Sequence, residues 1–147
     1  MTDEKNFNDS HKKFVKHFSN GLTHNLILWI ISKQKIHGYG IIKKLEMFFS
    51  FDDSECDITV SSSKVYPILS KMEKKGLIVG EWDINENNKR VKYYSITDDG
   101  TKVLEIIQNH LRQVMSNSSW IEFYKDMTGV EINNEKRNWN WKPYKGL

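Results

Sequence analysis

Cysteine, proline and long apolar runs are scarce in this chain. Its 147 residues include one cysteine, Cys56, and two prolines. A single cysteine excludes an intrachain disulfide and a cysteine-rich zinc site, and it is typical of a reducing compartment. The longest apolar run, Leu26 to Ile31, is too short to span a bilayer, and the first residues lack the apolar core of a signal peptide. We therefore expect a cytoplasmic protein with no membrane partner.

Sequence motifs for catalysis and metal binding are also lacking. The chain contains no glycine-rich phosphate loop, no serine elbow between a strand and a helix, and no coherent acid–base pair. Its five histidines lack the close pairing and the acidic companions of a metal site. We expect no catalytic residue, no metal and no cofactor, and we predict that the chain is not an enzyme.

The composition fits one folded domain. Hydrophobic residues make up 38% of the chain and charged residues 28%, which is ordinary for a globular protein of this length. The net charge is only +3. Any function in nucleic-acid binding must therefore depend on where the basic residues lie rather than on their sum.

Apolar periodicity predicts three helices in the first half of the chain. The segment Leu22 to Ile31 is apolar on almost every face, as in a buried helix. Apolar residues between Ile41 and Phe49 recur at helical spacing. The serines Ser61 to Ser63 precede a third helix, and we expect its start late in this run, because Pro67 belongs near a first turn.

A hairpin and a fourth helix follow. Two β-favouring segments, residues 77–84 and 90–96, flank a turn rich in asparagine. Thr97 is placed to cap a fourth helix, whose apolar residues recur at spacings of three and four. Ile58 to Val60 is a candidate for one further short strand.

The order helix, helix, helix, hairpin, helix is that of a winged helix-turn-helix, an α+β fold that is mainly α. We expect a C-terminal dimerisation helix beside it. The predicted divisions are an N-terminal arm or helix (1–19), a winged-helix DNA-binding domain (20–97), the dimerisation helix (98–127) and a C-terminal tail (128–147).

Several segments also resemble a known family. These segments are Leu26-Ile27-Leu28, His37-Gly38-Tyr39-Gly40-Ile41, Val65-Tyr66-Pro67-Ile68-Leu69, Met72-Glu73-Lys74-Lys75-Gly76-Leu77-Ile78 and Arg90-Val91-Lys92-Tyr93-Tyr94-Ser95-Ile96-Thr97 with Gly100. On these residues, the stretch from Leu22 to Leu111 resembles the PadR family of transcriptional regulators. The resemblance implies a dimer held by the C-terminal helix, a repressor-like role and, in some members, an effector site near the dimer interface.

In a winged helix the third helix enters the major groove and the hairpin follows the DNA backbone. The apolar side of the third helix directs serines, lysines and a tyrosine outward. The basic hairpin tip is suited to phosphates, although a solvated surface is the alternative for all these residues. The candidate DNA-binding residues are Tyr39, Ser61, Ser62, Ser63, Lys64, Tyr66, Ser70, Lys71, Lys74, Asn88, Lys89, Arg90 and Lys92.

The fourth helix carries more apolar surface than one small domain needs to cover, which favours a second copy of the chain. The candidate dimer-interface residues are Leu104, Ile107, Leu111, Val114, Met115 and Trp120. Aromatic residues beside this seam are suited to a small aromatic effector, and plain dimer packing is the simpler alternative.

We therefore predict a dimeric DNA-binding transcriptional regulator that acts as a repressor on double-stranded, pseudo-palindromic DNA. Two alternatives stay open. One is a winged-helix protein-interaction module, and the other is a small-molecule sensor without sequence-specific DNA binding.

Overall fold

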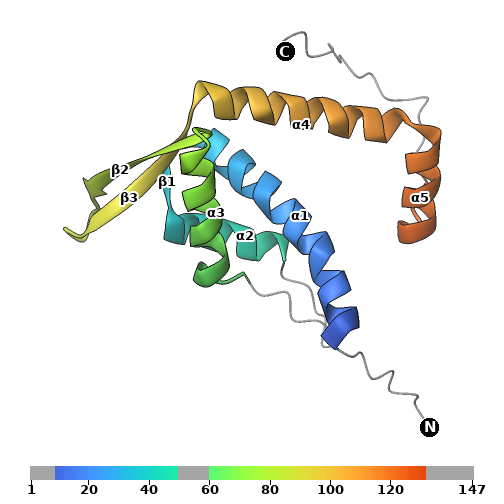
Figure 1. Ribbon diagram of the computed structural model, residues 1–147, viewed down its shortest axis with the longest axis horizontal. Coiled ribbons are helices and arrows are strands. Elements are labelled where there is room, and N and C mark those ends of the chain that lie inside the picture. Colours follow the sequence, from blue (N-terminus) through green and yellow to red (C-terminus); the bar gives the residue numbers. More distant parts are fainter. Residues whose placement is uncertain (1–8, 50–59, 132–147) are drawn as a thin grey trace. The chain divides into compact units, whose positions relative to one another are not determined.

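The computed structural model describes residues 9–49 and 60–131, and it confirms a mainly helical α+β fold (Figure 1). The chain divides into two compact units, Met1–Thr101 and Lys102–Leu147. The elements are α1 (Asp9–Lys33), β1 (Ile36–His37), α2 (Gly38–Phe48), α3 (Ser62–Lys74), β2 (Ile78–Ile84), β3 (Arg90–Ile96), α4 (Asp98–Ser116) and α5 (Ser118–Thr128).

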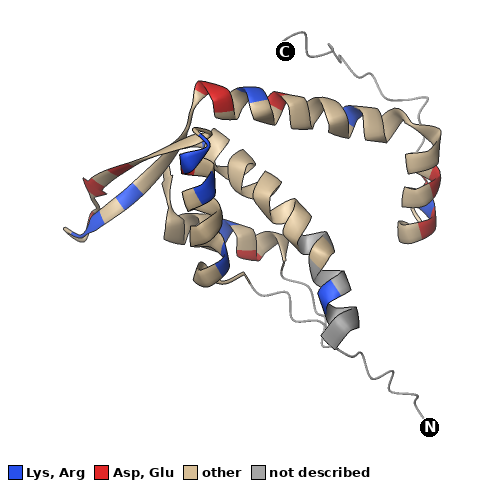
Figure 2. Cartoon of the chain, viewed as in Figure 1, with Lys and Arg blue, Asp and Glu red and all other residues tan. Residues whose placement is uncertain are grey.

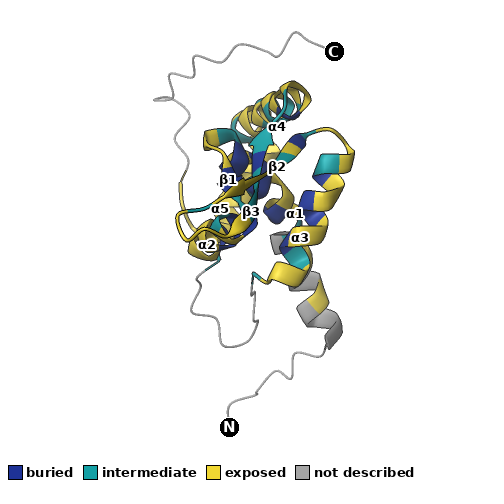
Figure 3. Ribbon diagram, turned by 90° about the vertical axis from the view of Figure 1, so that its left-hand side faces the viewer, coloured by how far each residue is buried: buried dark blue, intermediate teal, exposed yellow. Residues whose placement is uncertain are grey.

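An aliphatic core joins three helices to the sheet in the first unit. Ile27 and Ile31 of α1, Ile41 and Leu45 of α2, and Leu69 of α3 are almost completely buried. Burial of each such side chain contributes roughly 1.5–3 kcal/mol. Figure 3 colours the chain by burial, and the wing, which we define as the β2–β3 hairpin (residues 78–96), becomes exposed toward its tip.

Two helix starts differ from the sequence prediction. α1 begins at Asp9, well before the expected start at Leu22, because the single Gly21 inside it costs only about 1 kcal/mol. Ser61, the first serine of its run, occupies the N-cap position of α3 without a side-chain capping hydrogen bond, so the expected late start is wrong. Pro67 is consequently inside the helix, where its ring leaves only the carbonyl of the exposed Ser63 without its helical donor.

The sheet has three antiparallel strands in the order β1-β3-β2. The hairpin of β2 and β3 is confirmed and pairs along its whole length. The third strand of the sheet is the two-residue β1, which pairs with β3 and was not predicted from the sequence. Of the strand expected at Ile58 to Val60, Val60 is not in a strand, and the rest lies outside the described residues.

One junction connects the end of α3, both wing strands and the start of α4. The Thr97 hydroxyl donates to the Gly76 carbonyl at 2.5 Å and accepts from the Gly100 N–H at 3.1 Å, which confirms Thr97 as a cap. The Thr97 N–H donates to the Leu77 carbonyl at 3.1 Å. Gly100 is buried against that same carbonyl. Because any Cβ at Gly100 would overlap the Leu77 oxygen, only glycine fits there.

The expected single helix over residues 98–127 is divided into α4 and α5. Asn117 lies between them in an extended conformation, and its Oδ1 accepts hydrogen bonds from the backbone N–H groups of Ser119 and Trp120 at 3.0 and 3.3 Å. An asparagine followed by two serines therefore stops one helix and caps the next.

Replacing Gly100 with alanine should lower the free energy of unfolding by about 1–3 kcal/mol, because the new methyl group has no room beside the Leu77 carbonyl. Gly21→Ala is a matched control, since no heavy atom lies within 4 Å of a Cβ at that position. The control should instead stabilise the chain by up to about 1 kcal/mol. Urea denaturation measures the free energy of unfolding of both variants. An unchanged midpoint for Gly100→Ala would contradict the close approach of Gly100 to the Leu77 carbonyl.

Candidate nucleic-acid interface

α3 presents a polar face opposite the face that it buries. Val65, Ile68, Leu69 and Met72 are buried, as the helical periodicity predicted. Lys64 is half-buried. The remaining α3 candidates are all exposed: Ser61, Ser62, Ser63, Tyr66, Ser70, Lys71 and Lys74. This face therefore offers hydroxyl and ammonium donors to a polar ligand.

Tyr66 lies against the start of α2. A Cβ at Gly38 would be 2.5 Å from the Tyr66 ring, so the glycine lets the ring approach the backbone. His37 caps α2, and its Nδ1 accepts a hydrogen bond from the Gly40 N–H at 2.9 Å. The Tyr39 ring is 62% exposed and stacks on the His37 ring, with 6.3 Å between the centroids. Both tyrosines thus lie at the N-terminal end of α2.

The inner face of the wing is basic and aromatic. Side chains alternate between the faces of a strand, so Arg90, Lys92 and the buried Tyr94 share one face of β3. Trp82 on β2 is directly opposite Lys92 on β3 and belongs to the same face. We call these four residues the inner face.

The outer face of the wing carries its strand carboxylates. Glu81 is opposite Tyr93, and Asp83 is opposite Val91, so these pairs occupy the other side of the sheet. Figure 2 shows acidic residues on β2 and basic residues along β3 and on α3. The strand alternation therefore separates charges that are close in the sequence.

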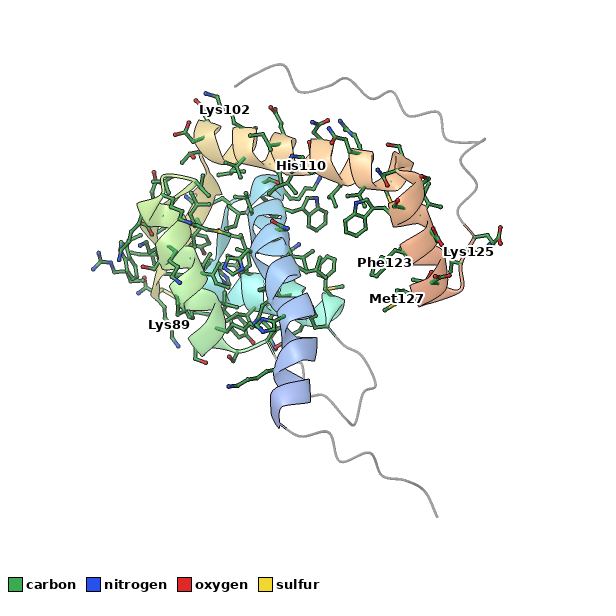
Figure 4. All side chains as sticks on the ribbon, turned by 45° about the vertical axis from the view of Figure 1, so that its right-hand side comes forward. Lys89, Lys102, His110, Phe123, Lys125 and Met127 are labelled. Atoms are coloured by element: carbon green, nitrogen blue, oxygen red, sulfur yellow. The ribbon has the colours of Figure 1, made fainter. Side chains whose placement is uncertain are left out.

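The tip of the wing is ordered by its own asparagines. Asn85 Oδ1 accepts hydrogen bonds from the backbone N–H groups of Asn87 and Lys89 at 3.0 and 2.9 Å. Asn88 adopts a left-handed conformation with φ of 58°. Lys89 extends from this tip (Figure 4), so the turn presents a cation at the far end of the hairpin.

Both cations of the inner face have partners within the chain. The Arg90 guanidinium lies 4.8 Å from the centroid of the Trp82 ring, in a cation–π arrangement. Lys92 Nζ donates to both carboxylate oxygens of Glu73 on α3, at 3.2 and 2.9 Å. The Lys92 bridge ties the wing to α3.

A hollow of about 490 Å³ is lined by residues of the wing, of α2 and of α3. Its lining includes Tyr39 and Tyr66 on one side and Trp82, Arg90 and Lys92 on the other. With His37 and Tyr94, which also line the hollow, the structure brings together seven aromatic or basic side chains, four of which were DNA-binding candidates.

A family model described as the transcriptional regulator PadR-like family matches residues 27–106. The match covers more than half of the chain, including α2, α3 and the whole wing. The chain belongs to the PadR-like family of transcriptional regulators.

Solved structures agree with this assignment. A PadR-like transcriptional regulator from Bacillus cereus is 30% identical, with a TM-score of 0.58, and the match covers 75% of this chain and 95% of that one. A PadR family regulator from Eggerthella lenta is 22% identical over 86% and 98% of the two chains, with a TM-score of 0.59. A Streptococcus transcriptional regulator is 21% identical over 74% and 96%, with a TM-score of 0.58. No curated protein matches the chain.

In this PadR-like chain, the sequence did not identify Trp82, His37 or Gly38 as parts of the site. Trp82 could have been found from the hairpin register, because it pairs with a basic candidate across the turn. The roles of His37 and Gly38 depend on contacts made only after folding. Among residues 9–49 and 60–131 no cluster of metal-binding side chains occurs, and no helix there has the length and apolar character to cross a membrane.

The second unit of the PadR-like chain contains the dimer candidates. Leu111 is 59% exposed and Trp120 is 49% exposed, whereas the other candidates on α4 are partly covered. On α5, Phe123 and Met127 project to the same side and Lys125 to the other (Figure 4). The second unit therefore has exposed apolar side chains on both α4 and α5.

The Lys92–Glu73 bridge has a measurable pH signature. The hydrogen bond that Lys92 donates to Glu73 raises the pKa of Lys92 above the ordinary value of 10.5. A raised pKa on folding means that the bridge stabilises the fold below the unfolded-state pKa, and that this contribution is lost as the pH rises through the folded-state pKa. We expect an NMR titration of Lys92 to show the raised pKa and Glu73→Gln to bring it back toward 10.5. Equal titration in the two proteins would contradict the bridge.

Proposed function

We propose that this regulator is a homodimer that binds double-stranded DNA and represses transcription. The observation that carries the proposal is the placement of Tyr66 of α3, Tyr39 of α2 and the basic inner face of the wing around one hollow. In the winged-helix mode of binding, α3 reads the major groove while the wing follows the backbone. The family assignment supports a role in transcription regulation.

The candidate residues fall into two groups by position. Ser63 and Lys64 are in the first turn of α3, where side chains of a recognition helix approach base edges. Lys89 and Arg90 are at the end of the wing, where they suit phosphates of any sequence. Base reading and backbone anchoring should therefore be separable by mutation.

The exposed apolar residues of the second unit support a dimer. Leu111 would be solvated in a monomer, and burying it against a second copy is favourable. A two-fold dimer presents two α3 helices, which matches a pseudo-palindromic DNA site.

A small aromatic effector stays a prediction. The hollow beside Trp120 measures about 220 Å³ and is lined by His110, Gln113, Val114 and Asn117 as well. It is smaller than typical ligand pockets of roughly 300–1,000 Å³. The protein-interaction module remains the competing function, and it predicts no binding to any duplex at low salt.

The first test compares the wing with α3. Arg90→Ala should weaken binding to all duplexes alike and lower the salt slope by about one unit per lost phosphate contact, or about two in a symmetric dimer. Lys64→Ala or Ser63→Ala should reduce the difference in binding free energy between a selected duplex and random DNA by about 1–3 kcal/mol. Fluorescence anisotropy on a duplex selected from a random pool measures both quantities.

Lys102→Ala is the matched control, because it removes one exposed cation outside α3 and the wing. It should leave the preference for the selected duplex unchanged. If Arg90→Ala erases sequence preference while the α3 variants keep it, the wing is the reading element and the assignment is reversed.

The second test concerns the dimer. Leu111→Glu should place a charge in the apolar seam and convert the dimer to a monomer, because a buried unpaired carboxylate is strongly unfavourable. Gln113→Glu adds the same charge two residues away, on a different face of α4, and should keep the dimer. Light scattering reports the mass of each variant, and a dimeric Leu111→Glu would exclude this residue from the interface.

A further inference from the structure

Trp82 is a large aromatic side chain with no role in the core. It is 58% exposed, whereas Tyr94, two residues beyond its cross-strand partner on the same face, is buried. Its one ring contact that the structure reveals is with Arg90, whose guanidinium is 4.8 Å from the indole centroid. The indole thus contacts a cation and is not buried in the packing of the fold.

The stacked pair faces a site of ligand size. Trp82 and Arg90 line the hollow of about 490 Å³, with Tyr39 and Tyr66 across from them. A planar guanidinium held by a ring keeps its N–H edge available for two parallel hydrogen bonds to a phosphate. A phosphodiester is also the group that the proposed binding mode brings between α3 and the wing.

The Glu73 carboxylate of α3, which faces the inner face of the wing, already has a hydrogen-bond donor within the chain. Both Glu73 oxygens accept from Lys92 Nζ. The strand carboxylates Glu81 and Asp83 belong to the outer face. The inner face can therefore approach an anion without a strand carboxylate beside Arg90.

We propose that the hollow receives one phosphodiester of the bound duplex and that Trp82 is the positioning residue that holds Arg90 toward it. The proposal rests on the proposed DNA-binding function. Stacking restricts the rotamers of a long side chain before binding, so less conformational entropy is lost when Arg90 contacts the phosphate.

The test is a double-mutant cycle in DNA binding. Anisotropy titrations with one labelled duplex compare wild type, Trp82→Ala, Arg90→Ala and the double variant. Trp82→Ala should lower affinity about two- to fivefold, the range of exposed cation–π pairs. In the Arg90→Ala background the same change should have no further effect, because the group that Trp82 positions is gone. Trp82→Phe, which keeps a ring, should retain most of the affinity.

A merely structural role gives a different pattern. If Trp82 only maintained the wing, Trp82→Ala would weaken binding equally with and without Arg90, and it would lower the thermal midpoint. Equal losses in the two backgrounds, or no loss at all, would overturn the positioning role while DNA binding itself stands. Absence of wild-type binding at low salt would overturn the proposed function and this inference together.

Discussion

The fold of the first unit depends on the close approach of Gly100 to the Leu77 carbonyl. Beside this contact, the Thr97 hydroxyl donates a hydrogen bond to the Gly76 carbonyl, just after α3, and accepts one from the Gly100 N–H in the first turn of α4. β2 begins immediately after this junction and β3 ends immediately before it. The direction in which the wing leaves α3 is therefore set by three hydrogen bonds and one missing side chain.

The second constraint is the register of the wing. Because strand alternation has a period of two, a slip of one residue would move Arg90 and Lys92 to the outer face and bring carboxylates toward α3. Three features fix the register: the turn held by Asn85, the buried Tyr94, and the bridge from Lys92 to Glu73. The charge pattern of the candidate site is thus a consequence of turn chemistry and core packing.

Elements with strong local signals could be predicted from the sequence. The buried side of α3, the hairpin and the Thr97 cap follow from periodicity and capping residues within a few positions. The division at Asn117 and the strand β1 were missed, because an asparagine cap and a two-residue strand leave almost no periodic trace. Contacts between distant residues were also missed, as Lys92 and Glu73 are 19 residues apart. Such pairs are decided by how α3 packs on the wing, which no local pattern encodes.

A net charge of +3 is too small to attract DNA by itself, so the proposed binding depends on where the charges are placed. The bridge to Glu73 occupies Lys92, whereas Arg90, the other inner-face cation, contacts the neutral ring of Trp82. An ion pair screens its own cation, whereas a cation–π contact orients the charge and leaves it in place. The same small hairpin can therefore use one basic residue to hold itself against α3 and another to meet an anion. Its stability and its proposed binding do not then compete for a single side chain.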